Sequence, residues 1–280
     1  MITCNLMGGL GNQLFQIFTT ISNAINHKLI FAFIDIDKLG GGQTIIRHTY
    51  WDNFLIKLKP FTSKAFPQMV IVKEKEFKYN PINLQINKGK DICLYGYFQS
   101  YKYFVENFNV ICIIIGLEEI KKNIVQKSAF TQEQLNNTVS LHFRLGDYKK
   151  IQQYHPIMKF EYYRKAIGLL QIKEPSRKNI LYFCEEEDLA DVNETIDELK
   201  VDFPMVNFIR ASNDLSDWEQ MILMSCCRDN IIANSSFSWW GAQFNLNPYK
   251  TVYYPAVWFG EAAGHDTRDM CPIDWVKIIV

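Results

Sequence analysis

The strongest constraint on the fold is a strand–helix alternation that fills the second half of the chain. Short apolar runs typical of buried strands alternate there with stretches whose apolar residues recur at helical spacing. The predicted strands are 138–145, 178–187, 206–212, 229–234 and 251–258, and the predicted helices are 160–172, 189–200, 216–227 and 235–247, the last stopped by Pro248. Because parallel strands need crossover connections, five strands alternating with helices predict a parallel, doubly wound sheet.

The first part of the chain begins with the same rhythm. A short strand at 2–6 leads into the glycine-rich turn MGGLGNQ and an apolar helix, and a strand at 29–37 follows, which together make a βαβ unit. Residues 60–110 are less regular, and the polar stretch 119–137 is the best candidate for a domain boundary. The predicted fold is α/β, with two Rossmann-like domains at 1–135 and 136–280 that face a cleft.

Charge and composition narrow the function classes. The 280 residues include 30 basic and 30 acidic side chains, so a wide cationic surface for nucleic acid is not expected. Seven cysteines without regular spacing predict reduced thiols in a cytoplasmic protein, without a disulfide framework or a zinc site. No basic leader begins the chain, and the longest apolar block, 110–117, is too short to span a bilayer.

Residues 139–150, VSLHFRLGDYKK, begin as an alternating strand and end in a turn. Arg144 lies at the carboxyl end of this strand, where an arginine can hold a diphosphate with two parallel hydrogen bonds. Asp147 can orient Arg144 or His142, or it can cap the next segment. A buried Arg–Asp pair that only ties the strand to its loop explains the same residues.

Ser235 and Ser236 lie where a predicted strand passes into a helix. Their hydroxyls and the first free amides of the helix can form a phosphate nest, although serine also caps helices without a ligand. The acids at 185–188 end another strand and either bind a base or ribose or begin a solvated helix. Since ligands of open α/β folds bind at the carboxyl edge of the sheet, these positions suggest a nucleoside diphosphate held without metal.

The glycine-rich turn supports an alternative function. Gly9-x-Gly11 begins a dinucleotide-binding fingerprint, and Asp35 follows at about the distance of the acid that holds a ribose. The third small position is Leu14, however, and a tight strand-to-helix turn requires glycine in any case. Asp35 and Asp37 also form an Asp-x-Asp pair of the kind that binds metal in some sugar transferases, but we interpret them as solvent-facing acids. A Rossmann-type NAD(P)-dependent oxidoreductase remains the alternative.

Four motifs occur in an order that resembles the α-1,2-fucosyltransferases, glycosyltransferase family 11. They are GGLGNQLFQ, GYFQSYKYF, HFRLGDY and NIIANSSFSWWGA, and the resemblance covers nearly the whole chain. It implies a GT-B-like architecture and an inverting transfer of L-fucose from GDP-β-L-fucose to the 2-hydroxyl of a galactose in a glycan acceptor. It also implies no cofactor or metal, a C-terminal domain that binds GDP-fucose, and an N-terminal domain on the acceptor side.

The resemblance implies roles for particular residues of this chain. Arg144 would contact the donor diphosphate, and His142 would support that site. The acceptor proton would go to Asp147, His142 or Asp35, or late in the reaction to the departing diphosphate itself. The donor-binding positions would be Gly8, Gly9, Gly11, Asn12, Glu185, Glu186, Asn234, Ser235, Ser236 and Phe237. Two departures are Leu145, where the family usually has a second arginine, and Glu185-Glu186, where related enzymes often have Asp-Asp.

A non-catalytic glycan-binding module built from the tyrosine- and tryptophan-rich segments is the third hypothesis. It predicts glycan binding without affinity for GDP. The absence of the membrane anchor found in Golgi members of the family indicates a soluble bacterial or viral form.

Overall fold

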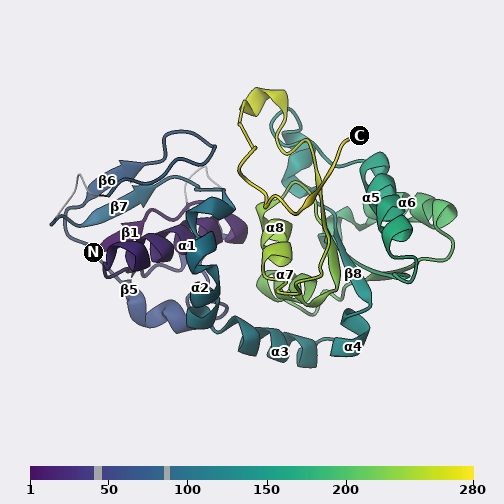
Figure 1. Cartoon of the computed structure of the whole chain (residues 1–280), viewed down its shortest axis with the longest axis horizontal. Coiled ribbons are helices and arrows are strands. Elements are labelled where there is room, and N and C mark those ends of the chain that lie inside the picture. Colours follow the sequence, from purple (N-terminus) through teal and green to yellow (C-terminus); the bar gives the residue numbers. More distant parts are fainter. Residues whose placement is uncertain (41–45, 85–88) are drawn as a thin grey trace. The chain divides into compact units, whose positions relative to one another are not determined.

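The computed structural model describes residues 1–40, 46–84 and 89–280, which form two compact units (Figure 1). Unit 1 comprises Met1–Ile120 and His265–Pro272, and unit 2 comprises Lys121–Gly264 and Ile273–Val280. The units divide inside a continuous helix, α3 (Leu117–Lys127), whereas the sequence placed the boundary between residues 135 and 136. The assignment of an acceptor side, a donor side and a cleft stays a prediction.

Unit 1 is built on a small parallel sheet in the order β1-β7-β6. Its strands and helices are β1 (Ile2–Cys4), α1 (Leu10–His27), β2 (Phe33–Ile34), β3 (Lys38–Leu39), β4 (Arg47–His48), β5 (Thr62–Ser63), β6 (Val70–Lys73), β7 (Ile92–Tyr95) and α2 (Phe108–Ile115). The strand predicted at 29–37 is shorter than expected, because only Phe33–Ile34 pair regularly, with β5. Phe31 makes a single parallel bridge to Ile2 of β1.

Unit 2 contains the alternation that the sequence predicted. Its elements are α4 (Gln132–Leu135), β8 (Thr138–His142), α5 (Phe160–Lys173), β9 (Asn179–Phe183), α6 (Leu189–Asp202), β10 (Asn207–Arg210), α7 (Asp217–Cys226), β11 (Asp229–Ile231), α8 (Ser236–Gln243), β12 (Val252–Pro255) and β13 (Val276–Ile278). Every pairing in its sheet is parallel. Figure 1 shows α5 and α6 on one side of this sheet and α7 and α8 on the other.

The strand order of this sheet is β10-β9-β8-β11-β12-β13. Numbered from β8, it is 3-2-1-4-5-6, the order of dinucleotide-binding folds. The α/β class and a doubly wound, Rossmann-like unit 2 are therefore confirmed. The sequence missed the sixth strand, β13, because it has only three residues and is preceded by a loop with a single 3-10 turn, Glu261–Ala263, and not by an α-helix.

Strand β8 is buried along its whole length, and its two faces differ. Val139 and Leu141 belong to an apolar cluster with residues of α5 and α6. On the other face, the Nδ2 of Asn230 donates a hydrogen bond to the Oγ of Ser140 at 2.7 Å. The alternation seen in the sequence thus separates an apolar buried face from a polar buried face.

Helix α8 ends at Gln243, well before Pro248. The Nζ of Lys250 donates to the carbonyl oxygens of Ala242 and Asn245, so the end of the helix is satisfied without continuing it. Trp239 and Trp240 of this helix are fully buried, as the core interpretation of these residues expects.

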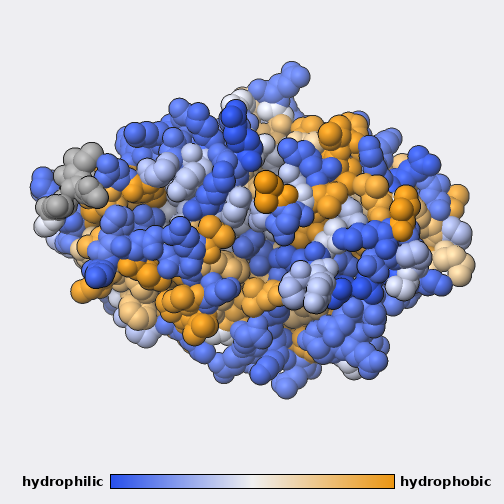
Figure 2. Space-filling view, viewed as in Figure 1, coloured by the Kyte–Doolittle hydropathy of each residue, from blue (hydrophilic) through white to orange (hydrophobic). Residues whose placement is uncertain are grey.

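The polar stretch 119–137 forms most of α3 and all of α4, and the surface over these helices is mostly hydrophilic in Figure 2. All seven cysteines are free. Within the described ranges, none of the helices is both long and apolar enough to cross a bilayer.

Candidate functional site

The predicted site residues of unit 2 gather where its strand order reverses. Strand β8 lies between β9 and β11, and all three run parallel, so their carboxyl ends meet at one edge. Arg144 follows β8, Glu185 follows β9, and Asn234 follows β11. This reversal point is where open α/β sheets bind their ligands, because the loops diverge there and leave a crevice.

Arg144 is the electrostatic centre of this edge. Its guanidinium forms ion pairs with Asp147 and with Glu185, and it lies 5.1 Å from the ring centre of Tyr148. Burial works against the guanidinium charge, but Glu185 and Asp147 outweigh it and raise the pKa of Arg144. Its side chain keeps 21% of its surface exposed, so a ligand anion can reach the same group by displacing a carboxylate.

The loop that carries Arg144 is held by an acid that the sequence did not single out. The backbone N–H of Gly146 donates to the Oδ2 of Asp188 at 2.7 Å, and the Nζ of Lys149 contacts the Oδ1 of Asp188 at 2.8 Å. Gly146 has φ +38°, and a Cβ there would lie 2.7 Å from the Oε2 of Glu185. Asp188 is 3% exposed, and its only sequence signal was its place at the end of the acidic run 185–188.

His142 is the last residue of β8 and is 7% exposed. Burial lowers its pKa to about 3, and the nearby charge of Arg144 adds to the effect, so the imidazole is neutral at neutral pH. Its Nδ1 is buried without a hydrogen-bond partner among the described residues, and its ring lies 5.5 Å from that of Phe237. A neutral imidazole can position a group here, but it is a weak base.

The β11–α8 loop joins the Arg144 loop through Tyr148. The Tyr148 hydroxyl donates to the carbonyl oxygen of Asn234 at 3.2 Å. The Nδ2 of Asn234 donates to the carbonyl oxygens of Pro156 and Trp258, which fixes this side chain in the loop.

Ser235 caps α8, as its Oγ accepts from the N–H of Phe237 at 3.3 Å. Ser236 and Phe237 are half-buried in the first turn of the same helix. The capping interpretation is thus observed, and the predicted phosphate contact of these residues stays a prediction.

The two glutamates after β9 point to different partners. Glu185 pairs with Arg144, whereas Glu186 pairs with Arg210 and accepts from the Nδ2 of Asn213. Arg210 ends β10, the neighbouring strand, and no sequence motif marks it as a site residue. Of the two glutamates, only Glu185 therefore forms an ion pair with Arg144. Leu145, at the position of the usual second arginine, is 8% exposed and packs in the apolar cluster.

Gly8, Gly9, Gly11 and Asn12 belong to unit 1. Gly8 has φ +76°, and a Cβ there would lie 2.5 Å from the Nδ2 of Asn12, so this turn needs glycine. The Nε2 of Gln99 donates to the Oδ1 of Asn12 at 2.8 Å. Two motifs that are far apart in the sequence, GGLGNQLFQ and GYFQSYKYF, are joined by this bond.

A second unpredicted acid supports the GYFQSYKYF segment. The carboxylate of Glu74 accepts from the N–H of Tyr97 at 2.8 Å and from the N–H of Phe98 at 3.0 Å. Phe98 has φ +51°, which is unusual for a residue with a side chain. Glu74 therefore holds a strained turn directly before Gln99.

Asp35 forms an ion pair with the Nζ of Lys59 at 3.0 Å. Its carboxylate is thus engaged within unit 1, which weakens the ribose-binding interpretation. Within the described residues, no group of three or more His, Cys, Asp or Glu side chains is arranged to hold a metal ion.

Comparison with known proteins gives one family and several relatives. A family model described as Glycosyl transferase family 11 matches residues 1–278. The chain is 27% identical over 302 residues to an Escherichia coli protein named alpha-1,2-colitosyltransferase, and the match covers 99% of each protein. It is 28% identical over 207 residues to the Escherichia coli O-antigen biosynthesis glycosyltransferase WbnK, covering 71% of this chain and 64% of the relative.

Among solved structures, a mutant of Arabidopsis thaliana FUT1 in complex with GDP matches at 10% identity with a TM-score of 0.49, covering 91% of this chain and 70% of the other. Because that score is below 0.5, the fold rests on the topology of the chain itself.

Proposed function

Because this chain belongs to glycosyltransferase family 11, we propose that it transfers L-fucose from GDP-β-L-fucose to the 2-hydroxyl of a galactose in a glycan acceptor. The transfer inverts the anomeric configuration and needs neither metal nor cofactor. The observation that carries the proposal is the position of Arg144 at the reversal point of a 3-2-1-4-5-6 sheet, in a loop whose Tyr148 contacts Asn234 just before α8. The relative that covers the whole chain, named for an α-1,2 transfer, supports the linkage.

The proposed chemistry follows from where charge develops. The acceptor oxygen forms a bond to the anomeric carbon of fucose while the bond from that carbon to the diphosphate oxygen breaks, and GDP leaves with the bonding electron pair. Negative charge grows on the departing diphosphate, and a fixed donor in such a position contributes about 2.7–4 kcal/mol to transition-state stabilisation. Arg144 is the donor that we assign to this role, and it releases Glu185 or Asp147 when the diphosphate binds.

A base must accept the proton of the acceptor hydroxyl. His142 is poorly suited, because its pKa is about 3 and its ring is buried. Asp35 is paired with Lys59, and no step of the proposed transfer releases it. Asp147 is likewise paired with Arg144, but diphosphate binding to Arg144 would free its carboxylate, which is 35% exposed. We therefore assign the role of the base to Asp147.

The alternative oxidoreductase is not favoured, because the family that matches the chain is a family of glycosyltransferases. The two functions are separated by a thermal-shift titration with GDP, GDP-fucose, UDP and NADH, each with and without EDTA. We expect stabilisation by GDP and GDP-fucose that EDTA does not change, since a ligand that binds only the native state raises its stability. Stabilisation by NADH instead would contradict the proposal.

Two substitutions test the residue roles. Arg144→Lys keeps the charge but loses the two-pronged hydrogen bonding, so we expect a lower turnover number with an unchanged unfolding midpoint. Asp147→Asn should remove transfer while GDP still binds. Full activity of Arg144→Ala would contradict the assigned role of this residue.

A further inference from the structure

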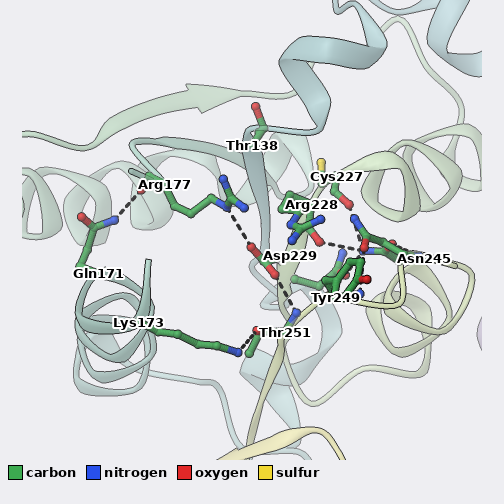
Figure 3. A network of polar contacts seen from close by, with 12 residues as sticks. Thr138, Gln171, Lys173, Arg177, Cys227, Arg228, Asp229, Asn245, Tyr249 and Thr251 are labelled. Carbon is green, nitrogen blue, oxygen red and sulfur yellow. Dashed lines mark hydrogen bonds and ion pairs between the residues drawn. The ribbon is translucent and has the colours of Figure 1, made fainter. Parts of the chain in front are cut away.

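A polar hollow of about 400 Å³ lies in unit 2, at the edge of the sheet opposite to Arg144. Figure 3 shows the polar contacts of residues that line it. Asp229 begins β11 and Thr251 directly precedes β12, so the hollow lies at the amino ends of these parallel strands. The end of α5 and the loop after it supply Lys173 and Arg177. Nothing in the proposed transfer uses these residues.

The hollow has an excess of positive charge. Its lining contains four cationic and two anionic side chains, a formal excess of two positive charges: Lys173, Arg177, Arg228 and Lys250 against Glu174 and Asp229.

Asp229 is already satisfied within the protein. Its Oδ2 accepts from the Nε of Arg177 at 3.3 Å, and its Oδ1 accepts from the N–H of Thr251 at 2.7 Å. Asp229 is 2% exposed and uses both carboxylate oxygens within the protein, so it neutralises little of the positive charge of the other cations.

Among the described residues, the other three cations form no ion pair with an acid. Burial lowers the pKa of Lys250 to about 8, and the charge of Asp274 partly opposes that effect. The Nε of Arg228 is buried and has no hydrogen-bond partner in the part of the chain that the structure describes, and its guanidinium lies 5.9 Å from the ring centre of Tyr249. The Nζ of Lys173 donates to the hydroxyl of Thr251 at 2.7 Å. The Nζ of Lys250 donates to the carbonyl oxygens of Ala242 and Asn245 at the end of α8. Arg228 and Lys250 are half-buried, whereas Lys173 is exposed. An unpaired charge is costly to keep half-buried unless an anion or another hydrogen-bond acceptor compensates it.

We infer that this hollow is a second anion-binding site, which takes a phosphate-bearing small molecule such as a diphosphate or a sugar phosphate. The planar guanidinium of Arg228 can donate parallel hydrogen bonds to phosphate oxygens, and the ammonium group of Lys173 adds a second positive charge to the lining of the hollow. The hollow lies within the size range of small-molecule sites and exceeds what a single phosphate group fills. Tyr249 is 76% exposed beside Arg228, and its ring offers an apolar face to a sugar.

The test is a calorimetric titration of inorganic diphosphate into the full chain carrying Arg144→Ala, which removes the main anion ligand of the opposite edge. We expect binding that weakens at higher ionic strength. Adding Arg228→Gln should weaken diphosphate binding by about tenfold or more, because a charge-assisted hydrogen bond is lost. Lys122→Gln removes one exposed positive charge outside the hollow and should leave the affinity unchanged.

Equal affinity in the Arg228→Gln and Lys122→Gln proteins, or no binding of diphosphate at all, would overturn the inference. If Arg228→Gln does not fold, Lys173→Gln carries the same comparison, since Lys173 is exposed at the end of α5. Parallel titrations with inorganic phosphate and GDP distinguish a bare phosphate ligand from a nucleotide.

Discussion

Asp188 and Asp191 contact the same lysine but should differ sharply in what they contribute. The Nζ of Lys149 lies 2.8 Å from Asp188 and 2.6 Å from Asp191, whose side chains are 4% and 53% exposed. Asp188 also accepts the N–H of Gly146. A hydrogen bond to a charged group contributes about 1.5–3 kcal/mol, so Asp188→Asn should lower the free energy of unfolding by about that amount.

Asp191→Asn is the matched control, because exposed ion pairs contribute little. Urea unfolding followed by intrinsic fluorescence measures both variants. Because Asp188 holds the loop of Arg144, we also expect Asp188→Asn to weaken GDP binding, while Asp191→Asn leaves it unchanged. Equal effects of the two substitutions on stability would refute the argument that burial and the Gly146 contact set the difference.

Three further predictions concern other parts of the chain. Gly168→Ala in α5 should raise the free energy of unfolding by about 0.5–1 kcal/mol, because an added Cβ would meet only the ring edge of Phe203 at 4.0 Å; a lowered urea midpoint would contradict this. Burial lowers the pKa of His142 to about 3, so the unfolded chain binds the proton more strongly. Stability should then fall as pH drops from about 6.5 towards 3, by up to about 1.4 kcal/mol per pH unit, and His142→Asn should remove that part of the slope in urea titrations at several pH values. Glu74→Gln leaves one acceptor oxygen for two N–H groups and should cost about 1–3 kcal/mol in urea unfolding, whereas Glu76→Gln, which alters an exposed pair with Lys78, should have no measurable effect.

The sequence predicted the sheet of unit 2 well, because its strands and helices are read from apolar periodicity alone. It also placed Arg144 and Asn234 at the carboxyl edge, since both lie at the ends of predicted strands, although the observed strands β8 and β11 end earlier, at His142 and Ile231. The strand order that makes β8 and β11 neighbours is a long-range property, and no local pattern predicts it.

The supporting acids could not be predicted for the same reason. Asp188 contacts Gly146 across 42 residues, and Glu74 reaches Phe98 across 24 residues. In the sequence, each was one acid in a charged stretch that resembled solvated surface. The predicted end of α8 at Pro248 was wrong because Lys250 satisfies the helix carbonyls from beyond it.

The most direct test of the proposed function is the structure of the product. The protein is incubated with GDP-β-L-fucose and a β-galactoside in the presence of EDTA, and the product is analysed by nuclear magnetic resonance. We predict an α-linked fucose on the 2-hydroxyl of galactose, formed at the same rate with and without EDTA. A β-linked product, a different linkage position, or no transfer from GDP-fucose would contradict the account.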